Sequence, residues 1–166
     1  MGANAVVPAG EVLTDEENVL RGLNPQYCES GLPTPDCFML KKKDLVHDGP
    51  SFGIENPGGP IGQRQGIPHD QFALRITEGH GVARLSVREA LEHVRERGVR
   101  FYQKDAEDWG EYTSAHCMIS GHQEFTKGQL RELMRHLAKL ACKAVLRKPW
   151  ESQPTSLIPG SPPEQR

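Results

Sequence analysis

The chain has 166 residues, of which 20 are basic and 22 acidic, so its formal net charge is −2. This balance excludes polyanion binding through bulk charge, and any such binding must be local. Only 36% of residues are hydrophobic, and 13 prolines and 17 glycines indicate many loops around a modest core. The length predicts a flexible arm over residues 1–12, a single domain over 13–151 and a disordered tail over 152–166.

No apolar run approaches the roughly 20 residues needed to cross a bilayer. The N-terminus also lacks the basic segment and apolar core of a signal peptide. We therefore expect a cytoplasmic protein without membrane association. The cysteines contain no C-x-x-C pair and argue little for disulfides in that compartment; Cys117 and Cys142 are expected to be buried or nearly so, whereas Cys28 and Cys37 lie in predicted loops.

The first predicted element is a helix over residues 15–23. Thr14 and Glu17 have the spacing of a capping box. Val19, Leu20 and Leu23 would share one face of that helix.

Short apolar runs bounded by turn residues predict strands over 37–40 and 51–54. Ten of the twenty residues from 49 to 68 are Gly or Pro. A loop of this length, taken as 49–71, is commonly either functional or disordered.

The middle of the chain predicts alternating strands and helices. Strands are expected over 72–77, 82–85, 99–102 and 113–120. Ser86 and Glu89 form another capping box, which predicts a helix over 87–97 with Gly98 directly after it. Residues 103–112 form an acidic surface loop in which Trp109 covers the edge of the core.

The clearest element is an amphipathic helix that begins after Thr126 and ends before Pro149. Thr126 and Gln129 form its capping box, and proline cannot continue it. One arc of the helical wheel is apolar and the other basic. The apolar arc holds Leu130, Leu133, Met134, Leu137, Leu140, Ala141, Ala144 and Val145; the basic arc holds Lys127, Arg131, Arg135, Lys139, Lys143 and Arg147.

This order of elements predicts an α+β fold, with a small sheet backed by two or three helices that include the long C-terminal helix. The strand order does not follow from the pattern.

Two histidines, His116 and His122, lie six residues apart where the predicted strand turns toward the long helix. An imidazole with a pKa near neutrality suits acid–base catalysis or metal ligation. Cys117 cannot share a sheet face with His116, which excludes a local Cys–His dyad. The structural alternative is a hydrogen-bonded strand histidine followed by a histidine in a surface turn.

No complete cofactor or metal motif is present. The glycine-rich stretch 58–62 lacks the Gly-Lys-Ser/Thr ending of a phosphate-binding loop. Zinc would need three or four ligands, which His47, His69, His80 and Cys28 could supply only through folding. We expect no metal and no cofactor.

The basic face of the long helix has two interpretations. A solvated surface is the simpler one. The alternative is a phosphate-tracking face for nucleic acid through Lys127, Arg131, Arg135 and Lys139, although no aromatic residue lies among them.

A set of short motifs resembles a group of small uncharacterised bacterial proteins. They are Leu20-Arg21-Gly22-Leu23, then Gly31, Phe38 and Ser51, and finally Ala115-His116 with Ile119 and Gly121. The resemblance implies a bacterial cytosolic setting and carries no activity.

The sequence therefore favours a small non-enzymatic binding or accessory module with a protein partner. The alternative is a small enzyme or toxin that acts on nucleic acid or a nucleotide. In that case His116, with His122 nearby, would act as acid or base, Arg21, Arg75 and Ser51 would hold the substrate, and the loop 49–71 would close over the site.

Overall fold

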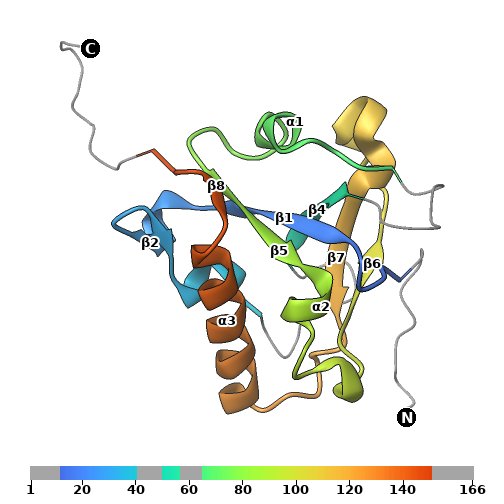
Figure 1. Cartoon of the computed structure of the whole chain (residues 1–166), viewed down its shortest axis with the longest axis vertical. Coiled ribbons are helices and arrows are strands. Elements are labelled where there is room, and N and C mark those ends of the chain that lie inside the picture. The colour runs from blue at the N-terminus through green and yellow to red at the C-terminus, as the bar shows by residue number, and fades with distance from the viewer. Residues whose placement is uncertain (1–11, 41–49, 57–64, 151–166) are drawn as a thin grey trace.

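The computed structural model describes residues 12–40, 50–56 and 65–150. Its centre is a six-stranded antiparallel sheet in the order β6-β7-β4-β1-β5-β8 (Figure 1). The strands are β1 (Asn18–Leu23), β4 (Ser51–Asn56), β5 (Gly81–Ser86), β6 (Arg100–Gln103), β7 (His116–Ser120) and β8 (Val145–Arg147). A separate two-stranded sheet pairs β2 (Cys28–Glu29) with β3 (Leu32–Pro33). The predicted α+β fold class is confirmed.

The helices lie on both sides of the large sheet (Figure 1). The short α2 (Val87–Ala90) and the long α3 (Lys127–Cys142) cover one face, with the 3-10 helix η2 (Pro35–Phe38) packed against α3. On the other face lie α1 (His69–Ala73) and the 3-10 segment η4 (Glu107–Ala115). Shorter 3-10 turns, η1 (Pro25–Tyr27) and η3 (Arg95–Arg97), complete the described elements. We call the two coverings the α3 layer and the α1 layer.

The predicted helix over 15–23 is wrong, because this segment is a turn followed by β1. The Thr14 backbone and hydroxyl do donate to Glu17, at 2.7 and 3.1 Å, but they close a turn. β1 lies between β4 and β5, and its apolar side chains are buried on both faces. Val19 packs in the α3 layer and Leu20 in the α1 layer. A central strand buried on both sides lacks clean alternation and resembles one face of a helix.

Two predicted strands are helical turns. Residues 37–40 fall in and after η2, where Pro35 starts the helix and the side chain of Phe38 is fully buried. Residues 72–77 fall in and after α1, which starts behind Pro68 and has Asp70 in its first turn. Proline fixes the backbone for a helix start, and this local preference prevailed over the short apolar runs.

Phe72 on α1 packs directly against the sheet because β4 carries a glycine beneath it. A Cβ at Gly53 would come within 2.7 Å of the Phe72 ring. The missing side chain allows the ring to reach the strand, and Phe72 is 1% exposed. Gly53 thereby positions α1, one wall of the site described below.

The predicted helix over 87–97 is broken in two. Ser86 caps α2 by accepting from the Glu89 amide at 3.3 Å, as expected. The chain then turns irregularly and forms η3 before Gly98, which has the left-handed φ of 91° expected of a residue that ends a helix. Leu91 and Val94 lie in the irregular stretch between α2 and η3, and both side chains are buried.

The long helix begins as predicted and ends earlier than predicted. Thr126 and Gln129 form both bonds of the capping box, and Leu133 and Leu137 are buried. α3 stops at Cys142, and Val145–Arg147 forms β8 instead of two more helical turns. Pairing with the exposed edge of β5, through Ala83↔Val145 and Val82↔Arg147, competes with helix continuation. Sequence periodicity contains no information on that edge.

The remaining predicted strands are confirmed, with changed bounds. Residues 51–54, 82–85 and 99–102 fall in or next to β4, β5 and β6. β7 starts at His116 rather than at 113, because η4 extends through Ala115. Trp109 in η4 is 6% exposed and covers the core edge as predicted. It packs edge-on against Phe72 and His116.

The predicted tail (152–166) lies outside the described residues, as do all of the predicted arm (1–12) except Val12 and, within the predicted loop (49–71), residue 49 and residues 57–64. Of the arm, Val12 is described and pairs with Tyr102 at the edge strand β6. Of the loop, β4 and the segment from residue 65 onward are described, and Ile67 donates its amide to Ile54 at 2.8 Å.

Candidate functional site

A cavity of about 480 Å³ lies at the end of β1 and β4, where residues of both layers meet. We call it the arginine pocket, because Arg21 and Arg75 both line it. Ser51 lies in the same wall, so the three residues predicted to hold a substrate come together. The other lining residues are Gly22, Asn24, Tyr27, Asp36, Cys37, Met39, Phe72, Ile76, Thr77, His80 and Trp109.

Arg21 is the most constrained charge in the pocket. Its Nε and Nη2 groups donate to the Cys37 carbonyl at 2.9 and 2.8 Å, and Nη1 donates to the Ser51 carbonyl at 2.9 Å. The guanidinium also lies over the rings of Phe38 and Phe52, at 5.8 and 5.5 Å from their centroids. Burial lowers the pKa of Arg21 to about 10. These contacts use three of its five N–H groups and include no carboxylate.

Arg75 approaches from the α1 layer. Its Nε donates to the Trp109 carbonyl at 3.1 Å, and Nη1 donates to the Gln71 carbonyl and side chain at 3.2 and 3.0 Å. Its guanidinium lies 4.8 Å from the centroid of the Tyr112 ring. Arg75 therefore holds η4 onto α1. Among the described residues Nη2 has no acceptor, so that group is available for a ligand.

The polar rim adds one titratable base and one opposing charge. Burial, and then the positive charge of Arg21, lower the pKa of His80 below its ordinary value. The exposed Asp36 at the start of η2 partly offsets the positive charge of the pocket. The hydroxyl groups of Ser51, Thr77 and Tyr27 supply further donors. The described wall therefore favours an anionic ligand.

His116 lies behind the pocket rather than in its wall. Its side chain is buried, and its Nδ1–H donates to the Lys104 carbonyl at 2.7 Å. Its ring meets Trp109 edge-on, with 5.0 Å between the ring centroids. Burial lowers its pKa below the ordinary value, so the ring is neutral at physiological pH. Trp109 lines the arginine pocket and contacts the His116 ring, whereas His116 itself does not line the pocket.

His122 does not occupy the expected surface turn, because its side chain is fully buried. It follows Gly121, whose φ is 104° and where a Cβ would come within 2.3 Å of the Gly98 carbonyl. This close approach draws the turn after β7 inward against the loop after η3. His122 does not line the arginine pocket.

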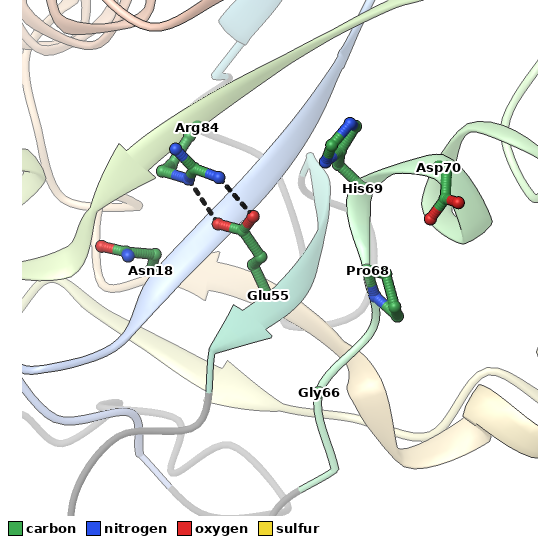
Figure 2. A pocket seen from close by; sticks show the side chains of 7 residues that line it. All are labelled: Asn18, Glu55, Gly66, Pro68, His69, Asp70 and Arg84. Atoms are coloured by element: carbon green, nitrogen blue, oxygen red, sulfur yellow. Dashed lines mark hydrogen bonds and ion pairs between the residues drawn. The ribbon is translucent and has the colours of Figure 1, made fainter. Parts of the chain in front are cut away.

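A second hollow, of about 630 Å³, lies on the α1 side of the sheet. Figure 2 shows its main feature, a two-pronged ion pair from Arg84 on β5 to Glu55 on β4, which spans the intervening β1. Both nitrogen–oxygen distances are 2.5 Å. His69 and Asp70 stand across the hollow from this pair. The charges of Arg84 and Glu55 neutralise each other. This hollow therefore favours a charged ligand less than the arginine pocket does.

The basic face of α3 is exposed as expected, with Lys127, Arg131, Arg135 and Lys139 all at the surface. Glu132 lies exposed among them. These residues line neither the arginine pocket nor the hollow beside Arg84 and Glu55.

Within residues 12–40, 50–56 and 65–150, no group of three or more His, Cys, Asp or Glu side chains has a metal-binding arrangement. In the same residues no helix has the length and apolarity to span a membrane.

Comparisons with protein-family models, with curated proteins and with solved structures found no match. The site must therefore be interpreted from its own geometry.

The sequence identified part of this site and missed the rest. The sequence predicts a phosphate-binding role for Arg21 and Arg75, and both line the pocket. His80 was considered only as a scattered metal ligand, and the role of Cys37 as a wall residue was not expected. Neither has a local motif, because their proximity to Arg21 depends on η2 and on the turn before β5.

Proposed function

We propose that this protein is a small binding module that holds an organic anion in the arginine pocket. The observation that supports this most is the state of Arg21. Its guanidinium is half-buried in a concave wall and has no carboxylate partner among the described residues. Carbonyl groups satisfy three of its N–H groups but leave its charge uncompensated, and an anion would compensate that charge.

The lining indicates what the rest of the ligand looks like. A volume of about 480 Å³ suits a small organic molecule. Arg75 supplies a second guanidinium to the same cavity from the opposite layer, which adds to its preference for a carboxylate or phosphate. Met39, 41% exposed, and Ile76 offer apolar surface beside these charges. The preferred ligand therefore carries an anionic group and a small apolar part.

Binding without chemistry is the function that we favour. The alternative, a small enzyme or toxin acting on a nucleotide, needs His116 at the ligand. Its ring instead lies behind Trp109 with Nδ1 engaged. In the described part of the chain, no hydrogen bond joins the His80 ring to the Ser51 hydroxyl or the Cys37 thiol, which line the same pocket. The terminal carboxylate of a protein partner is an anionic group of the same kind. The bacterial cytoplasmic setting stays a prediction.

The test uses Trp109 as the reporter. The chain has two tryptophans, and Trp150 is 57% exposed, so Trp150→Phe leaves Trp109 in the pocket wall as the single indole. This protein is titrated with inorganic phosphate, AMP, citrate and a tripeptide with a free carboxylate. We expect a saturable change in Trp109 fluorescence for at least one organic anion, with calorimetry giving one site per chain.

Two variants make the test specific. Arg21→Lys keeps the charge but loses the planar fork, and we expect at least a roughly ten-fold weaker affinity. The matched control is Arg88→Lys, because Arg88 is exposed and pairs with Asp15 and Glu16 at 3.8 Å. Thermal melts establish that both variants are folded. An absence of saturable binding, or equal affinities for all three proteins, would contradict the proposal.

A pH series adds an independent readout. An anion beside His80 would raise the lowered pKa of that imidazole, so binding would be coupled to proton uptake. We therefore expect affinity to rise as the pH falls from about 8 to about 6, and His80→Gln to flatten that dependence. Affinity that is independent of pH would place the anion away from His80.

A further inference from the structure

Two thiols meet behind the wall of the arginine pocket. Cys28, on β2, and Cys37, in η2, place their Sγ atoms 3.9 Å apart. The Cys37 Sγ also lies 3.5 Å from the Tyr27 carbonyl. A third thiol, Cys142 at the end of α3, donates to the Pro33 carbonyl at 3.4 Å on the same side of the molecule. The fold therefore gathers cysteines that are widely separated in the sequence.

The pair is connected to the pocket through the backbone. The Cys37 carbonyl accepts two of the three hydrogen bonds that hold Arg21. Thr34 also connects the two segments that carry these cysteines, because its amide and hydroxyl both donate to the Tyr27 carbonyl. Any change that fixes Cys37 relative to Cys28 therefore also fixes the acceptor of Arg21.

We infer that Cys28 and Cys37 form a reversible disulfide that controls the rigidity of the arginine pocket. Bond formation brings the sulfurs from 3.9 Å to about 2.0 Å and closes a loop of roughly ten residues. The inference rests on the proposed function only for its effect on the ligand. The disulfide itself is a separate claim.

The reaction needs an oxidant, and a low-molecular-weight disulfide supplies it. Cys28 is the more exposed thiol, since Cys37 is 2% exposed. The Cys28 thiolate attacks one sulfur of the oxidant, which forms a mixed disulfide and releases one small thiolate. Cys37 then loses its proton and attacks the Cys28 sulfur, which releases the second small thiolate. The two protons pass to the two leaving thiolates, and two electrons move from the protein to the oxidant.

The environment of the pair determines the speed and the stability of this switch. Burial raises the pKa of Cys28 to about 12 and also raises that of Cys37. Both groups are therefore protonated at neutral pH and attack slowly. Thiolates of high pKa are also poor leaving groups, so the disulfide resists reduction once formed. We therefore expect the disulfide to form slowly and to persist once it has formed.

The experiment maps the bond and measures the pocket separately. Reduced full-length protein is incubated with oxidised glutathione at about pH 8.5, where the thiolate fraction is larger. Free thiols are alkylated under denaturing conditions and peptides are mapped by mass spectrometry. We expect a Cys28–Cys37 linkage with loss of two hydrogens, while Cys117 and Cys142 are alkylated. Cys142→Ser should behave like the wild type, and Cys28→Ser should abolish the linkage.

Two further measurements connect the bond to the pocket. The oxidised protein should melt about 5–10 °C higher, because the cross-link restricts the unfolded chain. It should also bind the organic anion about three-fold more tightly, because the Arg21 acceptor is pre-organised. A linkage to Cys142, no linkage, or unchanged affinity in an oxidised protein that binds would overturn the inference. Anion binding to neither form would overturn the proposed function instead, while the mapped bond would stand.

Discussion

The two faces of the six-stranded sheet are covered in different ways. The α3 layer is apolar, with residues such as Leu133, Leu137 and Phe125 buried against the sheet in one large cluster. The α1 layer buries fewer residues, namely Leu20, Ile67, Phe72, Val82, Trp109 and Ala115. Hydrogen bonds from polar side chains also hold this layer together, such as the bond from Arg75 to the Trp109 carbonyl.

We infer from this difference that the α3 layer mainly stabilises the fold, whereas the α1 layer helps to form the candidate sites. Apolar packing on the α3 side stabilises the fold without requiring specific partners. On the α1 side, directional hydrogen bonds from polar side chains hold short segments in place and leave hollows between these segments. The second hollow lies on that side, and the arginine pocket lies where the two layers meet at the end of the sheet. Substitutions in each layer test this division, and the largest effect is expected in the α3 layer.

Leu137→Ala should cost about 2–5 kcal/mol in the free energy of unfolding, because the side chain is 1% exposed in the centre of the α3 layer. Chemical denaturation measures the effect. Lys139→Ala, at an exposed position of the same helix, is the control and should change stability by less than about 0.5 kcal/mol. An unchanged midpoint for Leu137→Ala would show that α3 is not part of the core.

His116→Ala should cost about 1–3 kcal/mol, because it removes the bond to the Lys104 carbonyl and the contact with Trp109. Thermal melts measure the cost, and anion binding through Trp109 fluorescence is measured beside it. His116→Gln is the matched control, since its amide retains a donor. A fully stable Ala variant that has lost a cellular or enzymatic activity would instead place His116 in an active site.

Acidification from about pH 7.5 to about pH 5.5 should destabilise the protein. Burial lowers the pKa of His116 in the folded state, and His80 shifts in the same direction. The unfolded chain therefore takes up protons near pH 6.5 while the folded chain does not, so stability falls as the pH falls through that value. Urea denaturation across this range should give a steeper pH dependence for the wild type than for His116→Gln. Equal slopes would mean that His116 titrates normally.

The smallest effect is expected on the basic face of α3. Changing Arg131, Arg135 and Lys139 to Glu should alter stability by no more than about 0.5 kcal/mol per site, because all three are exposed. We also expect no measurable nucleic-acid binding by the wild type near physiological salt. Fluorescence anisotropy with labelled RNA and DNA tests this, and a salt-sensitive micromolar complex that the triple variant loses would assign function to the α3 layer.

The sequence by itself determined the features that depend on near neighbours. The capping box at Thr126, the side-chain cap at Ser86, the apolar stripe of α3 and the helix-ending Gly98 are local, and the structure has each of them. The α+β class follows from such elements. The sequence also marks Arg21 and Arg75 as candidate binding residues, and both line the arginine pocket, while their binding role stays a prediction.

The tertiary structure decided everything that depends on long-range pairing. Val145–Arg147 became a strand because the edge of β5 was open, and residues 18–23 became the buried strand β1 because β4 and β5 flank them. The arginine pocket arises only when η2, α1 and β1 come together, which places Cys37, Arg75 and Arg21 around one cavity. Periodicity reports which side of an element is apolar, but it does not report which distant backbone will satisfy its hydrogen bonds.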